Sequence, residues 1–374
     1  ELVEERGASA AFRDKYAAVL STSIHFFDHT AHEYMHAVCD DLGMRYWGPF
    51  SAEMYDLLKE GERHRLQLFA EGFFDAVERQ VAVPRTHRPV EKAEFTYFPA
   101  SPGAKVATQG KKVVVVTDAE RGDENLRNMV ARLEGCFAEG IEVINLHEIA
   151  IRGGCLGCIQ CGLDNVCVYR DADDIRRIYG NLQSADVLVM AGTVSGRFLS
   201  SRWKLFIDRG FFNNHVPIFT GKQMGYLVAG PLGQVSNLRE VLTAYAECQR
   251  ANLAGIVTDE CGDSPQLDRL LDDLARRIID CAATGYVQPA TFRRVAGEKL
   301  FRDEIWSRLR MVFRADHRYY RAHGFYDFPK RSIRSRVRDA VMALLLHIPG
   351  FRREFKKRVK KDMVRPFEEV IRDA

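Results

Sequence analysis

Short apolar runs alternate with amphipathic stretches through the middle of the chain. The run Val113 to Val116 is all valine, which is typical of a β-strand buried on both faces. The apolar residues that follow recur every three or four positions, which predicts a helix that packs by one face. They are Leu126, Met129, Leu133 and Phe137. The alternation continues with predicted strands at Ile141–Leu146, Ala185–Ala191, Met224–Val228 and Gly255–Thr258, and predicted helices at Asp171–Leu182, Ser200–Arg209, Asn237–Arg250 and Gln266–Ala282.

Five strand-then-helix units in succession predict an α/β domain over residues 111–290. Parallel strands need crossover helices, so the expected core is a doubly wound, five-stranded parallel sheet. In such sheets ligands bind at the carboxyl ends of the strands. The loops that follow the strands are therefore the first place to look for a site.

Residues 1–83 repeat the last part of this pattern. Setting Lys15 against Lys222 aligns two apolar runs, Ala17–Ser21 and Tyr46–Phe50, with the last two strands of the sheet. This predicts a partial repeat of the same fold with two strand–helix units. Two strands cannot bury an apolar face alone, so the half-repeat either docks on the complete domain or belongs to a truncated one. The helix-like segment Glu1–Gly7 favours truncation.

Two further regions flank the predicted domain. Residues 84–110 are rich in proline and are predicted to be a linker. Residues 291–374 form a helical, basic C-terminal region, with helices predicted at Ile305–Phe313, Ser332–His347 and Arg352–Val364. Residues 316–329 between them are too aromatic for an ordinary loop and are expected to pack on the protein, at the mouth of the sheet.

Composition and charge narrow the class of protein. The chain has 374 residues, 46% of them apolar, which is typical of a folded protein rather than a disordered one. The longest apolar run, Ala340–Leu346, is far shorter than the roughly 20 residues of a bilayer-spanning helix. The net charge of +3 hides an asymmetry, because residues 291–374 carry 23 Lys and Arg against 11 Asp and Glu. An acidic body therefore carries a basic tail.

The basic tail has two interpretations. An apolar stripe at helical spacing precedes its most basic segment, Arg352–Arg365. Either the stripe packs on the protein and the bases face water, or the tail docks on a partner or on an anionic membrane surface. Nucleic acid is not expected, since no binding motif is recognised. The stripe consists of Val337, Val341, Leu344, Leu345 and Ile348.

Four cysteines fall within 13 residues after the second predicted strand. Cys155, Cys158, Cys161 and Cys167 have the spacing C-x2-C-x2-C-x5-C, which suits thiolates wrapped around one iron–sulfur centre. Structural zinc usually takes two C-x2-C pairs with a longer spacer. A zinc knot, disulfides and unliganded thiols remain alternatives. The other five cysteines are scattered, as expected of buried thiols in a reducing compartment.

At these cysteines the chain resembles the iron–sulfur flavoproteins, relatives of the NAD(P)H-dependent FMN reductases in the flavodoxin-like superfamily. The similar run extends from Val113 to about Ala283 and includes the four cysteines, Asp173 with Asp174, and the segment Ser200–Arg209. The resemblance implies a flavodoxin-like fold, FMN, a [4Fe-4S] cluster on the four cysteines, electron transfer between the two, and a homo-oligomer.

The resemblance also places FMN on three loops that follow strands. One departure is that the first loop, Thr117–Asn125, carries four carboxylates, which repel a phosphate unless they point away. Another is that the second loop lacks the family's aromatic residue, a place that Phe198 could take. The candidate flavin-binding residues are Thr117, Arg121, Gly122, Asn125, Thr193, Val194, Ser195, Gly196, Arg197, Phe198, Gly230, Pro231, Leu232 and Gly233.

A histidine-rich segment lies near the start of the chain. Its core, His32-Glu33-Tyr34-Met35-His36, matches H-E-x-x-H, in which histidines four residues apart chelate zinc and the glutamate activates water. His29 adds an imidazole on nearly the same face. The alternatives are a zinc hydrolase, another metal or proton-transfer role, and a partly solvated helix start without chemistry.

The sequence thus predicts a cytoplasmic iron–sulfur flavoprotein oxidoreductase that passes electrons between a [4Fe-4S] cluster and FMN, with ferredoxin or NAD(P)H as its redox partner. The rivals are a flavin-free four-cysteine metalloprotein, with zinc or iron–sulfur, and a zinc hydrolase at the H-E-x-x-H segment. The predicted location is peripheral to a membrane if the tail docks there.

Overall fold

The computed structural model describes residues 3, 6–214, 216–329 and 332–373. The chain forms two compact units, a body over residues 1–323 and a tail unit over residues 324–374. The contacts thus divide the chain after residue 323, whereas the change in sequence pattern lies near residue 290.

Five parallel strands form the central sheet of the body in the order β4-β3-β5-β7-β8. In chain order this is 2-1-3-4-5, the doubly wound order of flavodoxin-like folds, so the predicted fold class is confirmed. A two-residue strand, β6, was not predicted and pairs antiparallel with the end of β5. The bounds are β3 Val113–Thr117, β4 Glu142–Asn145, β5 Val187–Ser195, β6 Phe198–Leu199, β7 Gln223–Ala229 and β8 Asn252–Thr258.

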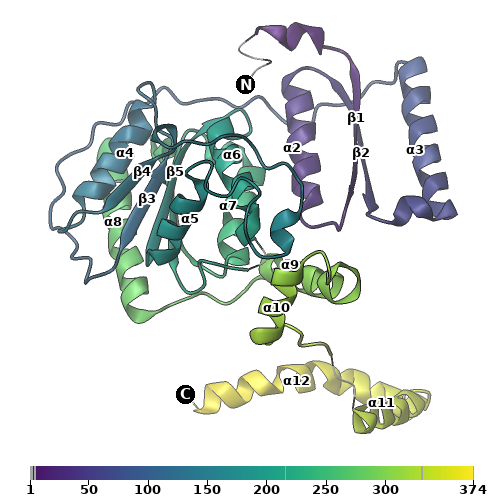
Figure 1. Cartoon of the computed structure of the whole chain (residues 1–374). Helices are drawn as coiled ribbons and strands as arrows, with labels where there is room; N and C mark the ends of the chain where they lie inside the picture. The colour runs from purple at the N-terminus through teal and green to yellow at the C-terminus, as the bar shows by residue number, and fades with distance from the viewer. Residues whose placement is uncertain (1–2, 4–5, 215, 330–331, 374) are drawn as a thin grey trace. The chain divides into compact units, whose positions relative to one another are not determined.

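Helices cover both faces of this sheet (Figure 1). Successive side chains of a strand point to opposite faces, so Val113 and Val115 pack with α4 and α8, while Val114 and Val116 pack with α5, α6 and α7. This explains why β3 is apolar throughout. The helices are α4 Glu124–Gly135, α5 Ile175–Ser184, α6 Ser201–Arg209, α7 Ser236–Cys248 and α8 Ser264–Thr284.

The half-repeat forms a two-stranded parallel sheet of β1 (Tyr16–Ser23) and β2 (Arg45–Glu53). It lies between α2 (Asp28–Asp41) and α3 (Glu60–Glu78), as Figure 1 shows. Helix α2 packs on α7 of the complete domain, and the Asn237 side chain donates to the Thr30 carbonyl at 3.0 Å. The half-repeat therefore packs on the complete domain through α2 and α7.

The linker runs along the body and contributes to its core. Tyr97 is fully buried and its hydroxyl donates to Asp268 of α8. After α8, helix α9 (Phe292–Glu304) packs on α7, and a π-helical turn at Ile305–Leu309 leads to α10 (Arg314–Ala322). Part of the aromatic stretch therefore lies in a helix of the body.

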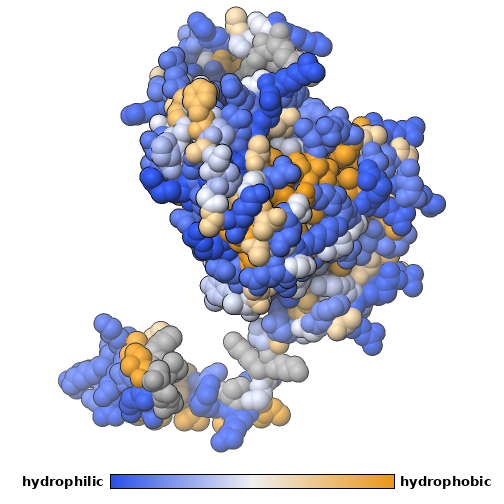
Figure 2. Space-filling model, turned by 90° about the vertical axis from the view of Figure 1, so that its left-hand side faces the viewer, coloured by the Kyte–Doolittle hydropathy of each residue, from blue (hydrophilic) through white to orange (hydrophobic). Residues whose placement is uncertain are grey.

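The tail unit contains helices α11 (Ile333–Leu345) and α12 (Pro349–Asp373). Figure 2 shows hydrophilic residues over most of its surface in that view, with a small apolar group among them. The predicted stripe on α11 is exposed: Val337 by 57% and Leu344 by 71%. Among the described residues, no helix is both long enough and apolar enough to cross a membrane.

Candidate functional site

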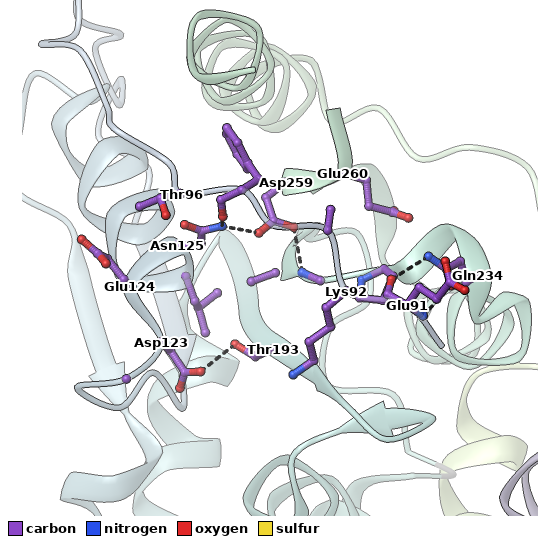
Figure 3. Close-up of a pocket in the computed structure, with 17 residues that line it drawn as sticks. Glu91, Lys92, Thr96, Asp123, Glu124, Asn125, Thr193, Gln234, Asp259 and Glu260 are labelled. Carbon is purple, nitrogen blue, oxygen red and sulfur yellow. Dashed lines mark hydrogen bonds between the residues drawn. The ribbon is translucent and has the colours of Figure 1, made fainter. Parts of the chain in front are cut away.

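A groove of about 420 Å³ opens at the carboxyl ends of β3, β5, β7 and β8 (Figure 3). Its volume lies within the roughly 300–1,000 Å³ of small-molecule pockets. Five of the predicted flavin-binding residues line it. They are Gly122, Asn125, Thr193, Gly230 and Pro231.

One wall of the groove comes from the linker, which sequence reasoning treated only as a connection. Lys92 extends from the linker across the groove toward Thr193 and supplies the positive charge among the lining residues (Figure 3). The linker is held in place at two points. The Glu91 backbone N–H donates to the Gln234 side chain, and the Gln234 amide donates to the Glu91 carbonyl, both at 2.9 Å. The Asn125 amide donates to the Phe95 carbonyl.

Carboxylates already occupy the donors that a bound phosphate would use. Asp123 accepts from the Glu120 backbone N–H at 3.0 Å and from the Thr193 hydroxyl at 3.3 Å. Asp259 likewise accepts from the Gly230 N–H at 2.7 Å and from the Asn125 amide at 2.8 Å (Figure 3). The groove therefore has the size and position of a ligand site, but its charge in this arrangement opposes a phosphate.

Arg197 was predicted to bind flavin, and the structure gives it a different place. Its buried guanidinium makes two hydrogen bonds of 2.7 Å to Asp41 of α2 and one of 2.6 Å to the Arg88 carbonyl. Arg197 thus fastens the half-repeat and the linker to the complete domain.

The other predicted flavin residues also lie outside the groove lining. Leu232 and Val194 are buried in the core, Thr117 is buried and caps its own loop, and the Gly233 N–H donates to Glu260. Ser195, Gly196 and Phe198 form the β5–β6 hairpin, and Arg121 is exposed.

Asp118, next to the groove loop, is a buried carboxyl at the end of β3. One oxygen accepts from the Ser200 hydroxyl, and the other has no hydrogen-bond partner among the described residues. Burial raises the pKa of Asp118 to about 6, while the hydrogen bond from Ser200 opposes that shift. Its charge therefore changes within the physiological range of pH.

The four cysteines come together on the loop between β4 and α5. Cys155 and Cys158 are exposed, and Cys161 and Cys167 are partly buried. Burial raises the pKa of Cys161 to about 11, and the charges of the three other cysteines add to the shift, so the four sulfurs form one electrostatic cluster. Left-handed residues separate successive cysteines, a backbone pattern that builds anion-binding concavities at iron–sulfur sites. These residues are Gly157, Ile159 and Asn165.

A buried ion pair closes the base of this loop. The Arg209 guanidinium donates to Asp173 at 2.7 Å and to the Gly153 carbonyl at 2.8 Å, and it lies 3.9 Å from the centre of the Tyr169 ring. Both charged side chains are 1% exposed, and Arg209 also interacts with Cys167. Burial acts to raise the pKa of Asp173, but the bond from Arg209 lowers it. A fixed ion pair, in which the two charges balance, therefore lies beside Cys167.

The closure of the loop also explains a misplaced boundary. The helix expected from Asp171 begins only at Ile175, because Asp173 and Asp174 accept hydrogen bonds from the backbone N–H groups of Arg152 and Ala150. The acids that look like a first helical turn instead tie the two ends of the cysteine loop together.

The spacing of the sulfurs bears on the choice of metal. Four thiolates on one zinc, at about 2.3 Å each, lie about 4 Å from one another. Within the described part of the chain, no three cysteine sulfurs lie within 4.8 Å of one another. A polynuclear cluster binds each thiolate to a different iron and so tolerates wider spacing. In the described part of the chain, the cysteine sulfurs are thus farther apart than a single bound zinc ion would hold them.

Among the described residues, the two histidines of the H-E-x-x-H segment do not come together as the zinc-hydrolase alternative requires. His32 is buried and its Nε2 lies 2.7 Å from the Ser21 hydroxyl of β1, whereas His36 faces the linker. His29 is exposed and stacks on Phe27. This arrangement does not favour the zinc-hydrolase alternative, because His32 serves the packing of α2 on β1.

Comparisons with known proteins give similarities to solved structures alone. No protein-family model matches this sequence, and none of the curated proteins is significantly similar to it. The Trp repressor binding protein from Bacillus subtilis is 18% identical, with a TM-score of 0.31 over 45% of this chain and 97% of that one. RosB with a bound 8-demethyl-8-formylriboflavin-5'-phosphate intermediate is 11% identical, with a TM-score of 0.39 over 52% and 88%.

An NADH:FMN oxidoreductase in its apo form is 12% identical, with a TM-score of 0.33 over 48% of this chain and 92% of that one. TM-scores this low allow no conclusion about what the present chain binds.

Proposed function

We propose that this chain is an iron–sulfur flavoprotein oxidoreductase, in which Cys155, Cys158, Cys161 and Cys167 hold a [4Fe-4S] cluster and the groove holds a flavin. The observation that carries the proposal is the buried Arg209–Asp173 pair under the clustered thiols. A cluster on four thiolates is an anion; the Asp173 carboxylate already balances the Arg209 charge, so the pair offers a fixed N–H donor beside Cys167.

The residues around the cysteines control access to the cluster. On one side Gly162 lies so close to the Val312 carbonyl that a Cβ would meet it at 2.5 Å, so the loop backbone is tightly packed there. On the other side Cys155 and Cys158 are exposed, and this is where a one-electron donor such as ferredoxin would approach. When bound, the cluster would supply one-electron transfer and the flavin two-electron chemistry.

The flavin half of the proposal rests on the groove at the carboxyl edge. Lys92 is the lining residue able to pair with a phosphate, and binding requires Asp123 to release the Glu120 N–H and the Thr193 hydroxyl. The occupied donors favour a second candidate, a flavin-free four-cysteine metalloprotein.

Visible spectra of anaerobically purified protein test both halves. We expect broad brown absorption with about four irons per chain, lost in Cys155→Ser and Cys158→Ser and kept in the controls Cys39→Ser and Cys281→Ser. Unchanged iron in both loop variants would remove the cluster. FMN that fails to bind at tens of micromolar would leave the flavin-free candidate.

A further inference from the structure

A second group of metal-ligating side chains lies between helix α2 and the linker, away from the groove and the cysteine loop. Glu33, His36 and Asp40 stand at positions i, i+3 and i+7, so they share one face of α2. His87 of the linker lies against that face. Glu33, His36 and His87 each offer a ligand atom, and these atoms lie within 4.8 Å of one another.

Asp40 holds His87 in a fixed orientation. Its carboxylate is 2% exposed and accepts from the backbone N–H groups of Thr86 and His87, at 3.1 and 2.8 Å. The same oxygen lies 3.1 Å from Nδ1 of the His87 ring. A carboxylate behind one ring nitrogen is the usual arrangement around a metal-bound histidine, because it leaves the other nitrogen free to ligate.

The other edge of the His87 ring lacks a balancing positive charge. Its Nε2 lies 2.7 Å from the Glu33 carboxylate. If Nδ1 donates to Asp40, a neutral ring presents a lone pair at Nε2, and two acceptors then face each other. At 2.7 Å this contact has the length of a hydrogen bond, so a metal ion that binds both atoms would take the place of the proton and hold the two atoms farther apart.

The His36 ring lies near the Asp40 carboxylate, with 3.6 Å between its Nε2 and Asp40 Oδ2. It packs edge-on to His87, at 4.7 Å between ring centres, and stacks on Tyr46 at 4.2 Å. The Tyr46 hydroxyl is buried and has no hydrogen-bond partner among the described residues. A polar group beside this ring pair is therefore unaccounted for.

We propose that Glu33, His36 and His87 bind a divalent transition metal ion, with Asp40 as the positioning residue for His87. Two imidazoles and a carboxylate are nitrogen and oxygen ligands that suit Zn²⁺. Glu33 is 52% exposed, so the fourth position opens to water. The ion would fasten the linker to α2, a few residues before the linker wall of the groove.

Zinc binding to the anaerobically purified protein tests this site. Each protein takes up one equivalent of Zn²⁺, is desalted, and is measured for retained zinc and for zinc X-ray absorption. We expect one tightly held zinc with nitrogen and oxygen neighbours at about 2.0–2.1 Å, and no sulfur shell at about 2.3 Å. His36→Ala, His87→Ala and Glu33→Gln should each lower the affinity more than about tenfold.

Two matched histidines on the same helix serve as controls. His29→Ala and His32→Gln should retain zinc like the parent protein. If His87→Ala unfolds, Glu33→Gln carries the test, because its side chain is half exposed. A sulfur-only shell, full zinc retention in His36→Ala and Glu33→Gln, or an equal loss in His32→Gln would overturn the proposal.

Discussion

Asp118→Asn isolates the effect of the buried carboxyl beside the groove. Its pKa of about 6 lies above the ordinary 3.8, so the folded chain binds a proton more tightly than the unfolded chain does. A carboxyl with a raised pKa therefore stabilises the folded state less and less as the pH rises from the ordinary value of 3.8 through the folded value of about 6. A pKa raised by about two corresponds to a loss of about 3 kcal/mol at pH 8, of which about 1.5 kcal/mol develops between pH 5 and pH 8.

Urea denaturation followed by tryptophan fluorescence measures this contribution. Asparagine keeps the shape of the side chain and removes its titration, so the free energy of unfolding of the variant should rise relative to the parent by about 1.5 kcal/mol from pH 5 to pH 8. If the difference in free energy of unfolding between Asp118→Asn and the parent stayed constant from pH 5 to pH 8, the reasoning would be refuted, however large that difference is at any one pH.

Three further predictions concern the cysteine loop, the groove and the tail. Arg209→Met leaves Asp173 buried without its partner, which should lower the free energy of unfolding by about 3–5 kcal/mol and speed the loss of iron to a chelator. The control is Arg176→Met at an exposed ion pair. Equal rates of iron loss in the two variants would contradict the role of the buried pair. Asp123→Asn should raise FMN affinity about tenfold in anaerobic titration, since it removes one charge facing the phosphate, and weaker binding would count against the groove. Through its tail, the protein should sediment with anionic liposomes at low salt and be released at high salt, and truncation after Pro349 should abolish this association. Absence of sedimentation at low salt would eliminate a membrane role for the tail.

The sequence pattern predicted the central sheet well, because strands such as β3 are buried on both faces and carry an unbroken apolar signal. The spacing of the four cysteines is local, so the sequence also places them together on the loop between β4 and α5. It missed the linker wall of the groove, because Lys92 and Phe95 reach the site through contacts far apart in sequence.

The same limitation explains the errors in side-chain roles. Arg197 follows a strand like a ligand-binding residue, yet its partner Asp41 is 156 residues away. The H-E-x-x-H spacing is compatible with one helix face, but the docking of α2 on β1 turns His32 toward Ser21 and His36 toward His87. The helical spacing of the two histidines in the sequence does not indicate that Ser21 and His87 will be their neighbours.

Mössbauer spectroscopy of protein reconstituted with ⁵⁷Fe tests the central claim most directly. The account predicts that most of the iron gives the signal of a diamagnetic [4Fe-4S] cluster, and that this signal disappears in Cys158→Ser while Cys281→Ser keeps it. Iron present only as isolated ions, or a signal that survives in Cys158→Ser, would contradict the assignment of Cys155, Cys158, Cys161 and Cys167 as cluster ligands.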